Sequence, residues 1–118
     1  MFLAAVVAAI AFGTVRVFAA AFKPDPHRAA AAFVGAVNRR DWGSACRMYS
    51  GRYLKLSQAE CRRFWWWGWR IYGPYTYKLV HAHLTAGRYH VELTRRGGAD
   101  FVDFAREGGS WKVVAGGW

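Results

Sequence analysis

Cysteine is scarce in this chain, and the few cysteines and histidines are not spaced as zinc ligands. Of 118 residues only two are cysteines, Cys46 and Cys61. Their spacing to each other and to the histidines matches no zinc-binding pattern. Nothing near either cysteine marks it as an activated nucleophile. We therefore expect neither a metal ion nor another cofactor, and no catalytic thiol.

Acidic residues are also few. Seven Asp and Glu face seventeen Lys and Arg, which gives a net charge of +10. The densest basic pairs are Arg39-Arg40, Arg62-Arg63 and Arg95-Arg96, and each falls in a different expected element. The excess charge suits a polyanion partner: nucleic acid, an anionic membrane surface or an acidic envelope polymer. The alternative is scattered, solvated charge without a partner.

The N-terminal 22 residues contain one charge, Arg16. The apolar run Phe2–Val15 and the small residues Ala19–Ala21 are typical of an export signal, although the usual basic start is missing. As a membrane span, the segment reaches about 20 residues only by including Arg16. We predict a signal peptide or membrane anchor over 1–22 and an extracytoplasmic domain, membrane-anchored or secreted, over 23–118.

Two alternatives to that interpretation remain. The basic residues that follow the segment, Lys23 and Arg28, would hold the domain in the cytoplasm by the positive-inside rule. The segment could also be a buried helix of the core. An even cysteine count beside an export-like segment nevertheless favours a Cys46–Cys61 disulfide over two buried free thiols.

Three helices are indicated by caps and apolar stripes. Asp25-Pro26 is typical of an N-cap followed by proline in the first turn. Asp41 can cap a second, short helix that ends at Gly51. Ser57–Glu60 is a capping box for a third helix, which Gly73-Pro74 ends. Cys46 and Cys61 fall on the apolar stripes of the second and third helices, which is compatible with a bridge between them.

The third helix holds four tryptophans between residues 65 and 69, too many for one buried stripe. Trp66 should point away from Trp65 and Trp69. An exposed tryptophan beside Arg62, Arg63 and Arg70 is typical of a membrane interface or a partner-binding surface. The alternative is that the sheet wraps around this helix and covers most of the cluster.

Beyond Pro74 the helical period disappears. Three glycine-containing turns, Ala86-Gly87, Gly97-Gly98 and Gly108-Gly109, divide the chain into four alternating runs. Two-residue loops there pair position 84 with 89, 96 with 99 and 107 with 110. One sheet face is then apolar, with Val80, Ala82, Leu84, Tyr89, Val91, Leu93, Val102, Phe104, Trp111, Val113 and Ala115. We predict an α+β fold, with three N-terminal helices packed on a curved four-stranded antiparallel sheet.

The opposite face is predicted to be polar, apart from residues such as Leu79 and Phe101. In this register His81, Glu92 and Asp103 form one row, and His83 faces His90. Such a row could hold a shared proton or a weak metal, but a solvated outer face is the simpler interpretation. On the inner side, Asp100 should face Arg95, either as an ordinary salt bridge or as a buried acid at the mouth of the sheet.

The residues 29–37, "RDWGSACRMYS" (40–50), "LSQAEC" (56–61) and "FVDFAREGGSWKVV" (101–114) carry a resemblance. Their arrangement resembles the nuclear transport factor 2-like superfamily, the cystatin-like cone shared by ketosteroid isomerases, SnoaL-like polyketide cyclases and scytalone dehydratase. The two-cysteine pattern is similar to small exported bacterial members. The resemblance implies helices inside a curled sheet, and often dimers through the outer face, where Leu79 and Phe101 would lie.

Catalytic members of that superfamily place an acid, a Tyr or a His inside the cone, whereas here only Tyr89 and Asp100 qualify. We therefore predict no catalytic residue and a non-catalytic domain that binds a partner protein or a small apolar ligand. The expected pocket residues are Trp65, Trp69, Tyr89, Phe104 and Trp111. A basic, aromatic surface for an anionic membrane or envelope polymer is one alternative, and a small isomerase or dehydratase is another. Nucleic acid is not an expected partner of an exported domain.

Overall fold

The computed structural model describes residues 25–72 and 76–117, so the predicted export segment 1–22 lies outside the described residues. The elements, in chain order, are α2 (Pro26–Asn38), α3 (Trp42–Arg47), α4 (Gln58–Tyr72), β1 (Lys78–Thr85), β2 (Arg88–Arg95), β3 (Gly98–Glu107) and β4 (Ser110–Gly116). The strands form one antiparallel sheet in the order β1-β2-β3-β4. The predicted α+β fold class is confirmed. None of the described helices is both long and apolar enough to cross a bilayer.

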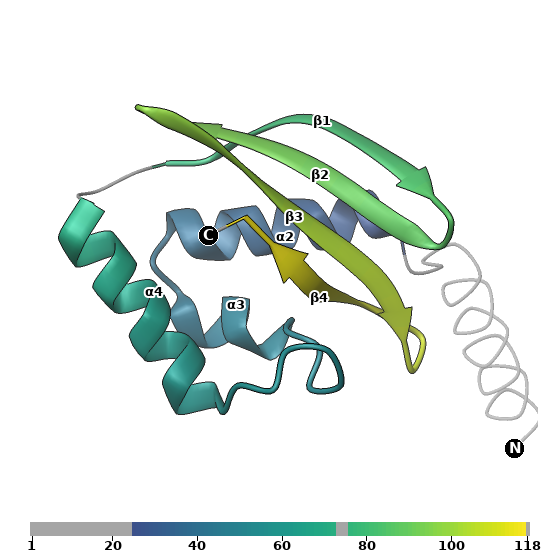
Figure 1. Ribbon diagram of the computed structural model, residues 1–118, viewed down its shortest axis with the longest axis horizontal. Helices are drawn as coiled ribbons and strands as arrows, with labels where there is room; N and C mark the ends of the chain where they lie inside the picture. The colour runs from purple at the N-terminus through teal and green to yellow at the C-terminus, as the bar shows by residue number, and fades with distance from the viewer. Residues whose placement is uncertain (1–24, 73–75, 118) are drawn as a thin grey trace, which may run out of the picture.

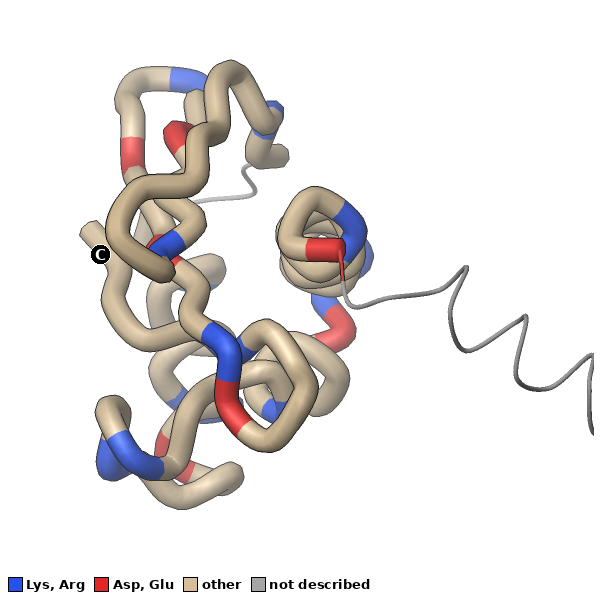
Figure 2. The backbone as a smooth tube through the Cα atoms, turned by 90° about the vertical axis from the view of Figure 1, so that its right-hand side faces the viewer, with Lys and Arg blue, Asp and Glu red and all other residues tan. Residues whose placement is uncertain are grey.

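Helix α2 lies along one face of the sheet and forms the second layer (Figure 1). Figure 2, turned by 90°, shows this helix nearly end on beside the strands. Phe33 is the centre of the contact, since its ring meets Trp65 of α4 at 6.0 Å and Phe104 of β3 at 5.9 Å, both edge to face. All three side chains are buried. This aromatic cluster joins α2, α4 and the sheet in one core.

The helix starts are formed by the residues that the sequence indicates. Asp25 accepts a hydrogen bond from the backbone N–H of His27, and Asp41 accepts one from the N–H of Ser44. Side-chain and backbone hydrogen bonds from Ser44 lower the pKa of Asp41 below its ordinary value of 3.8. Each cap thus satisfies an N–H group that has no partner within its helix.

Helix α4 is attached to the other helices mainly through α3. The predicted Cys46–Cys61 disulfide is present, and both cysteines are buried. One turn further, the indole of Trp65 stacks on Trp42 at 6.1 Å and donates a hydrogen bond of 3.0 Å to the hydroxyl of Tyr49. These contacts use one side of α4 and leave its other sides directed away from α3.

The pairing of β2 with β3 differs from the prediction. Arg95 pairs with Gly98, so the two-residue turn is Arg96-Gly97, one position earlier than expected. Gly97 has a φ of 84°, a conformation that glycine adopts without strain, and this selects it for the turn. The shift changes every partner by two residues, so each side chain keeps its predicted face but the expected His81–Glu92–Asp103 row does not form.

A β-bulge corrects the predicted inner face of β1. The register shifts between Leu79 and His81, so the bulge falls at Val80. Val80 is consequently 59% exposed, whereas Leu79, expected on the outer face, packs against the core. Leu84, beside the hairpin turn, is 58% exposed. A bulge adds one residue to a strand, so the facing predicted from the hairpin turn is reversed on the far side of Val80, at Leu79, which strict alternation cannot reveal.

A candidate ligand cleft

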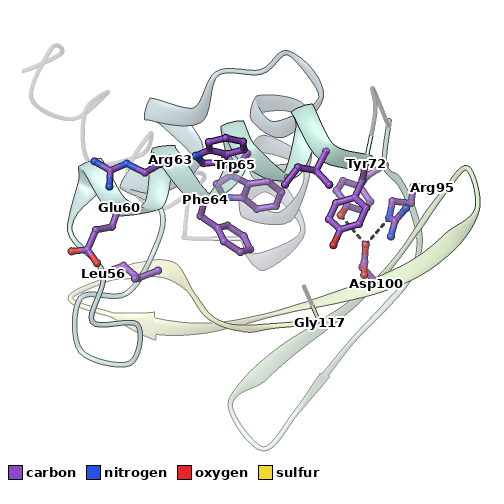
Figure 3. Close-up of a pocket in the computed structure, with 13 residues that line it drawn as sticks. Leu56, Glu60, Arg63, Phe64, Trp65, Tyr72, Arg95, Asp100 and Gly117 are labelled. Atoms are coloured by element: carbon purple, nitrogen blue, oxygen red, sulfur yellow. Dashed lines mark hydrogen bonds and ion pairs between the residues drawn. The ribbon is translucent and has the colours of Figure 1, made fainter.

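A cleft of about 780 Å³ lies between α4 and the sheet. Its size falls within the roughly 300–1,000 Å³ of ordinary small-molecule sites. Figure 3 shows α4 along one side of the cleft and Asp100 and Gly117 along the other. The lining residues are Leu56, Glu60, Arg63, Phe64, Trp65, Trp67, Gly68, Ile71, Tyr72, Tyr77, Arg95, Asp100 and Gly117.

The wall that α4 contributes is apolar. Phe64, Trp67 and Ile71 follow one another at helical spacing and lie along one edge of the helix. They are exposed by 42%, 48% and 63% respectively. Trp65 is buried beneath them and closes the inner side (Figure 3). A row of partly exposed apolar side chains in a concave site is the usual surface for an apolar ligand.

One end of the cleft is polar. The hydroxyl of Tyr77 donates to Oδ2 of Asp100 at 2.7 Å, and Nε of Arg95 donates to the same oxygen at 3.1 Å (Figure 3). The Asp100 side chain is only 10% exposed. Among the described residues no donor reaches the other oxygen, Oδ1. Asp100 therefore combines the expected salt bridge to Arg95 with the expected position at the mouth of the sheet.

The position of Tyr77 is determined by α2. The Asn38 side chain donates to the carbonyl of Tyr77 at 3.0 Å and accepts from its N–H at 2.8 Å. Asp100 in turn pairs with Leu93 in the β2–β3 ladder, and Leu93 is buried in the core, so Asp100 faces the inner side. Backbone pairing places Asp100, and one side-chain amide of α2 holds Tyr77, which lies just before β1.

The opposite end of the cleft carries Leu56, Glu60 and Arg63 (Figure 3). Glu60 also completes the predicted capping box, because it accepts from the N–H of Ser57 while Ser57 Oγ accepts from the N–H of Glu60. Twelve helical steps separate Glu60 from Tyr72, which is roughly 18 Å at 1.5 Å per residue. The cleft is therefore elongated, with an apolar middle, the Asp100–Arg95 ion pair at one end and the side chains of Glu60 and Arg63 at the other.

Of the five residues predicted to line a pocket, Trp65 lines this cleft. Trp69 lies under the guanidinium of Arg40, 4.5 Å from its ring centre. Phe104 is completely buried in the core. Phe64, Ile71 and Tyr72 also line the cleft and were not predicted to do so, although their spacing along α4 marks a second apolar edge beside the buried side.

The remaining two, Tyr89 and Trp111, lie near each other with ring centres 6.5 Å apart. The Tyr89 hydroxyl meets Nδ1 of His27 at 3.2 Å, which joins the start of α2 to the sheet. Burial, assisted by the charge of Asp25, raises the pKa of Tyr89 above its ordinary value of 10.0. Neither residue lines the cleft, so the structure brings only Trp65 of the predicted set to it.

The outer sheet face carries a different polar row from the expected one. His83 faces His90, as predicted, and His90 faces Asp103. Nδ1 of His90 lies 2.5 Å from the carboxylate, and the His90 ring stacks on Phe101 with centres 5.4 Å apart. Over residues 25–72 and 76–117, no three His, Cys, Asp or Glu side chains group closely enough to hold a metal ion. The row neutralises part of an open surface.

Comparison with known proteins supports the fold alone. No family model and no curated protein matches the sequence. Among solved structures, one described as a calcium/calmodulin-dependent protein kinase type II association domain from Thiobacillus denitrificans is similar, with a TM-score of 0.57 and 18% sequence identity. The match covers 79% of this chain and 92% of that one. That protein has the nuclear transport factor 2-like fold, so the similarity agrees with the predicted cone architecture.

Proposed function

We propose that this chain is a non-catalytic, exported member of the nuclear transport factor 2-like superfamily that binds a small, mainly apolar ligand in the cleft between α4 and the sheet. The observation that carries the proposal is the row Phe64, Trp67 and Ile71, which is partly exposed along a concave site that ends at Asp100. Exposed apolar side chains of this size are costly in water unless a partner covers them.

The charges of the cleft favour a neutral ligand. Glu60 and Arg63 lie at one end, and Asp100 and Arg95 lie at the other, so the charges balance at both ends. The Oδ1 atom of Asp100 can accept a hydrogen bond from a hydroxyl or an amide N–H. The ligand class that fits is an elongated amphiphile, with an apolar body along α4 and one donor group beside Asp100.

A small isomerase or dehydratase is the second candidate, and the position of Asp100 in the cleft is the observation that favours it. Acid–base catalysis of that kind also needs a donor directed at the substrate. Tyr77 and Arg95 instead donate to Asp100 itself, and His81, His83 and His90 belong to the β1–β2 hairpin rather than to the cleft lining. Binding without catalysis is therefore the preferred function.

The Cys46–Cys61 bridge is compatible with an oxidising compartment, and it supports export together with the apolar residues 1–22. Thiol alkylation in intact host cells tests this part of the proposal. A bridged pair at steady state is expected, and a fully alkylated pair would contradict export.

The ligand proposal is tested with N-phenyl-1-naphthylamine, a neutral aromatic amine that becomes fluorescent in apolar sites. Ile71→Lys places a charge in the cleft at a side chain that is 63% exposed, so the fold should tolerate it. Val80→Lys, at a similarly exposed position on β1, is the matched control. We expect Ile71→Lys to weaken binding of the dye at least about tenfold, in line with burying a charge in an apolar site.

Equal binding by the wild type and both variants would disprove the cleft as the site. Native mass spectrometry of the full chain purified from its host provides a second readout. A copurified neutral amphiphile in the wild type, absent from the Ile71→Lys variant, is the expected result. Turnover of a bound substrate that Asp100→Asn abolishes would instead establish the enzymatic candidate.

A further inference from the structure

The side of α4 that faces neither α3 nor the cleft carries arginine and tryptophan. Arg62, Trp66 and Arg70 are spaced four residues apart on this side, and Arg63 lies between it and the cleft. All four are exposed. The guanidinium of Arg70 lies 5.1 Å from the centre of a Trp66 ring, and Trp67 meets Trp66 edge to face at 5.2 Å. Arg62, Trp66 and Arg70 form what we call the α4 outer face, and Arg63 and Trp67 lie where this face meets the cleft.

The positive charge of this face is not neutralised by the protein. Within the described part of the chain, no carboxylate forms an ion pair with Arg62, Arg63 or Arg70; the ion pairs found there lie on the sheet. Glu60, the only acidic residue of α4, caps the start of the helix. The face therefore presents two cations without an ion-pair partner, Arg62 and Arg70, beside the partly exposed indole of Trp66.

We propose that the α4 outer face docks on the surface of an anionic phospholipid bilayer. Charge complementarity selects a negative partner, and the apolar groups select a bilayer among negative partners. Trp66 is 42% exposed, and further along the same helix Ile71 and Tyr72 are 63% and 75% exposed. Arginine beside tryptophan on a helix that lies in the interface is the usual composition of peripheral membrane contacts.

Other polyanions fit these observations less well. A soluble acidic polymer needs cations but does not need exposed Ile71 and Tyr72 at the same helix. A single-stranded nucleic acid would stack its bases on open aromatic faces. The guanidinium of Arg70 already lies over one face of Trp66, which reduces the surface left for a base to stack on. This inference goes beyond the ligand cleft, because Arg62, Trp66 and Arg70 do not line it; Trp67, Ile71 and Tyr72 border both surfaces.

The test measures how the full chain partitions onto two kinds of vesicle. One is pure phosphatidylcholine, and the other contains about 30 mol% phosphatidylglycerol, which makes its surface strongly anionic. The ratio of the two partition coefficients removes the contribution of residues 1–22, which is common to all variants. Arg62→Gln/Arg70→Gln should lower this ratio roughly thirtyfold, at about fivefold or more per arginine near an anionic surface. The control Arg96→Gln/Arg106→Gln removes the same charge from exposed positions on the sheet side.

A ratio that falls equally in the two double variants would overturn the proposal, because it would reflect net charge alone. A second readout is quenching of tryptophan fluorescence by brominated phosphatidylglycerol. Trp66→Phe should remove part of the quenching if Trp66 lies in the interface, and unchanged quenching would refute the docking geometry. A third outcome would assign the face to a soluble polymer instead. In that case the chain would bind inorganic polyphosphate as tightly as vesicles, the binding would depend on Arg62 and Arg70, and brominated lipid would not quench the tryptophans.

Discussion

Removal of the Cys46–Cys61 bridge should loosen α4 more than any other element. The bridge closes a loop with a sequence separation of 15 residues. A loop of that length corresponds to about 3 kcal/mol of stabilisation in the chain-entropy model. For a domain of this size, 1 kcal/mol shifts the melting temperature by about 4–8 °C. The variant Cys46→Ala/Cys61→Ala should therefore melt roughly 12–24 °C below the oxidised wild type.

The loss should be local because α4 has few other attachments. Its remaining contacts with α3 include the Trp65–Trp42 stack and the 3.0 Å hydrogen bond from Trp65 to Tyr49. The sheet, in contrast, keeps three complete ladders between its four strands. In hydrogen exchange, the amides of α4 should become exchangeable at a lower free energy of opening than those of β2 and β3.

The assay is thermal unfolding by circular dichroism, with and without dithiothreitol, followed by hydrogen exchange with mass spectrometry. The reductant should lower the melting temperature of the wild type to that of the alanine variant and leave the variant unchanged. The reasoning would be refuted if the oxidised wild type and the variant melted within about 3 °C of each other. Equal loss of protection in α4 and β2 would refute the local part.

Two further predictions concern the cleft edge and the cap of α3. A Cβ at Gly117 would lie 2.8 Å from Cδ1 of Phe101, so Gly117→Ala should destabilise the domain by about 1–3 kcal/mol in urea unfolding. Gly51→Ala, which meets nothing within 4 Å, is the control, and equal costs would contradict this account. The pKa of Asp41 is lowered in the folded state by hydrogen bonds from Ser44, so its contribution to stability is complete above its unfolded value of 3.8 and is lost as the pH falls through the folded value. Asp41→Asn should remove that part of the acid dependence of the melting temperature, and an unchanged profile would contradict the cap's role.

The helices were predictable from sequence because their signals are local. Asp25, Asp41 and the Ser57–Glu60 box all cap in the structure as the sequence indicates. The disulfide followed from two cysteines on neighbouring apolar stripes. The caps involve residues a few positions apart, so the chain need not be folded in space before they can be recognised. The disulfide spans 15 residues, and it was predictable because the chain has only two cysteines.

The sheet was predictable in its faces except near two bulges, in β1 and between Val113 and Ala115 of β4, and the partners of β2 and β3 were not predictable. Alternation fixes which side a residue faces, and a shift of two residues in the β2–β3 pairing preserves it. Because of this shift, Asp103 pairs with His90 and not with Glu92 as predicted. The prediction had placed the two-residue turn one position too late in the sequence. The bulge at Val80 has no local sequence signal at all, since it depends on how β1 follows the curvature of β2.

The cleft was not predictable because it depends on the direction in which α4 leaves α3. The predicted pocket assumed that all inward aromatic side chains surround one cavity. Instead Phe33, Trp65 and Phe104 pack on one another and fill the centre of the cone. The open volume therefore lies at the edge of α4, beside a second row of apolar residues. A wholly buried helix would have the same apolar row, so the sequence alone does not indicate a cleft there.

The three sides of α4 differ in burial, and only the side that contacts α3 is buried in the core. Cys61 and Trp65 are buried, which accounts for the side packed on α3. Phe64 and Ile71 on the cleft side, and Trp66 on the outer side, are exposed by 42% or more. Polar residues at Trp66 and Ile71 would keep the helix and improve its solubility, whereas Phe64 also packs edge to face on the buried Trp65, with ring centres 5.7 Å apart. The exposed parts of these side chains are the surfaces on which the proposed ligand and bilayer contacts would be made, and the dye and vesicle measurements test the two sides separately.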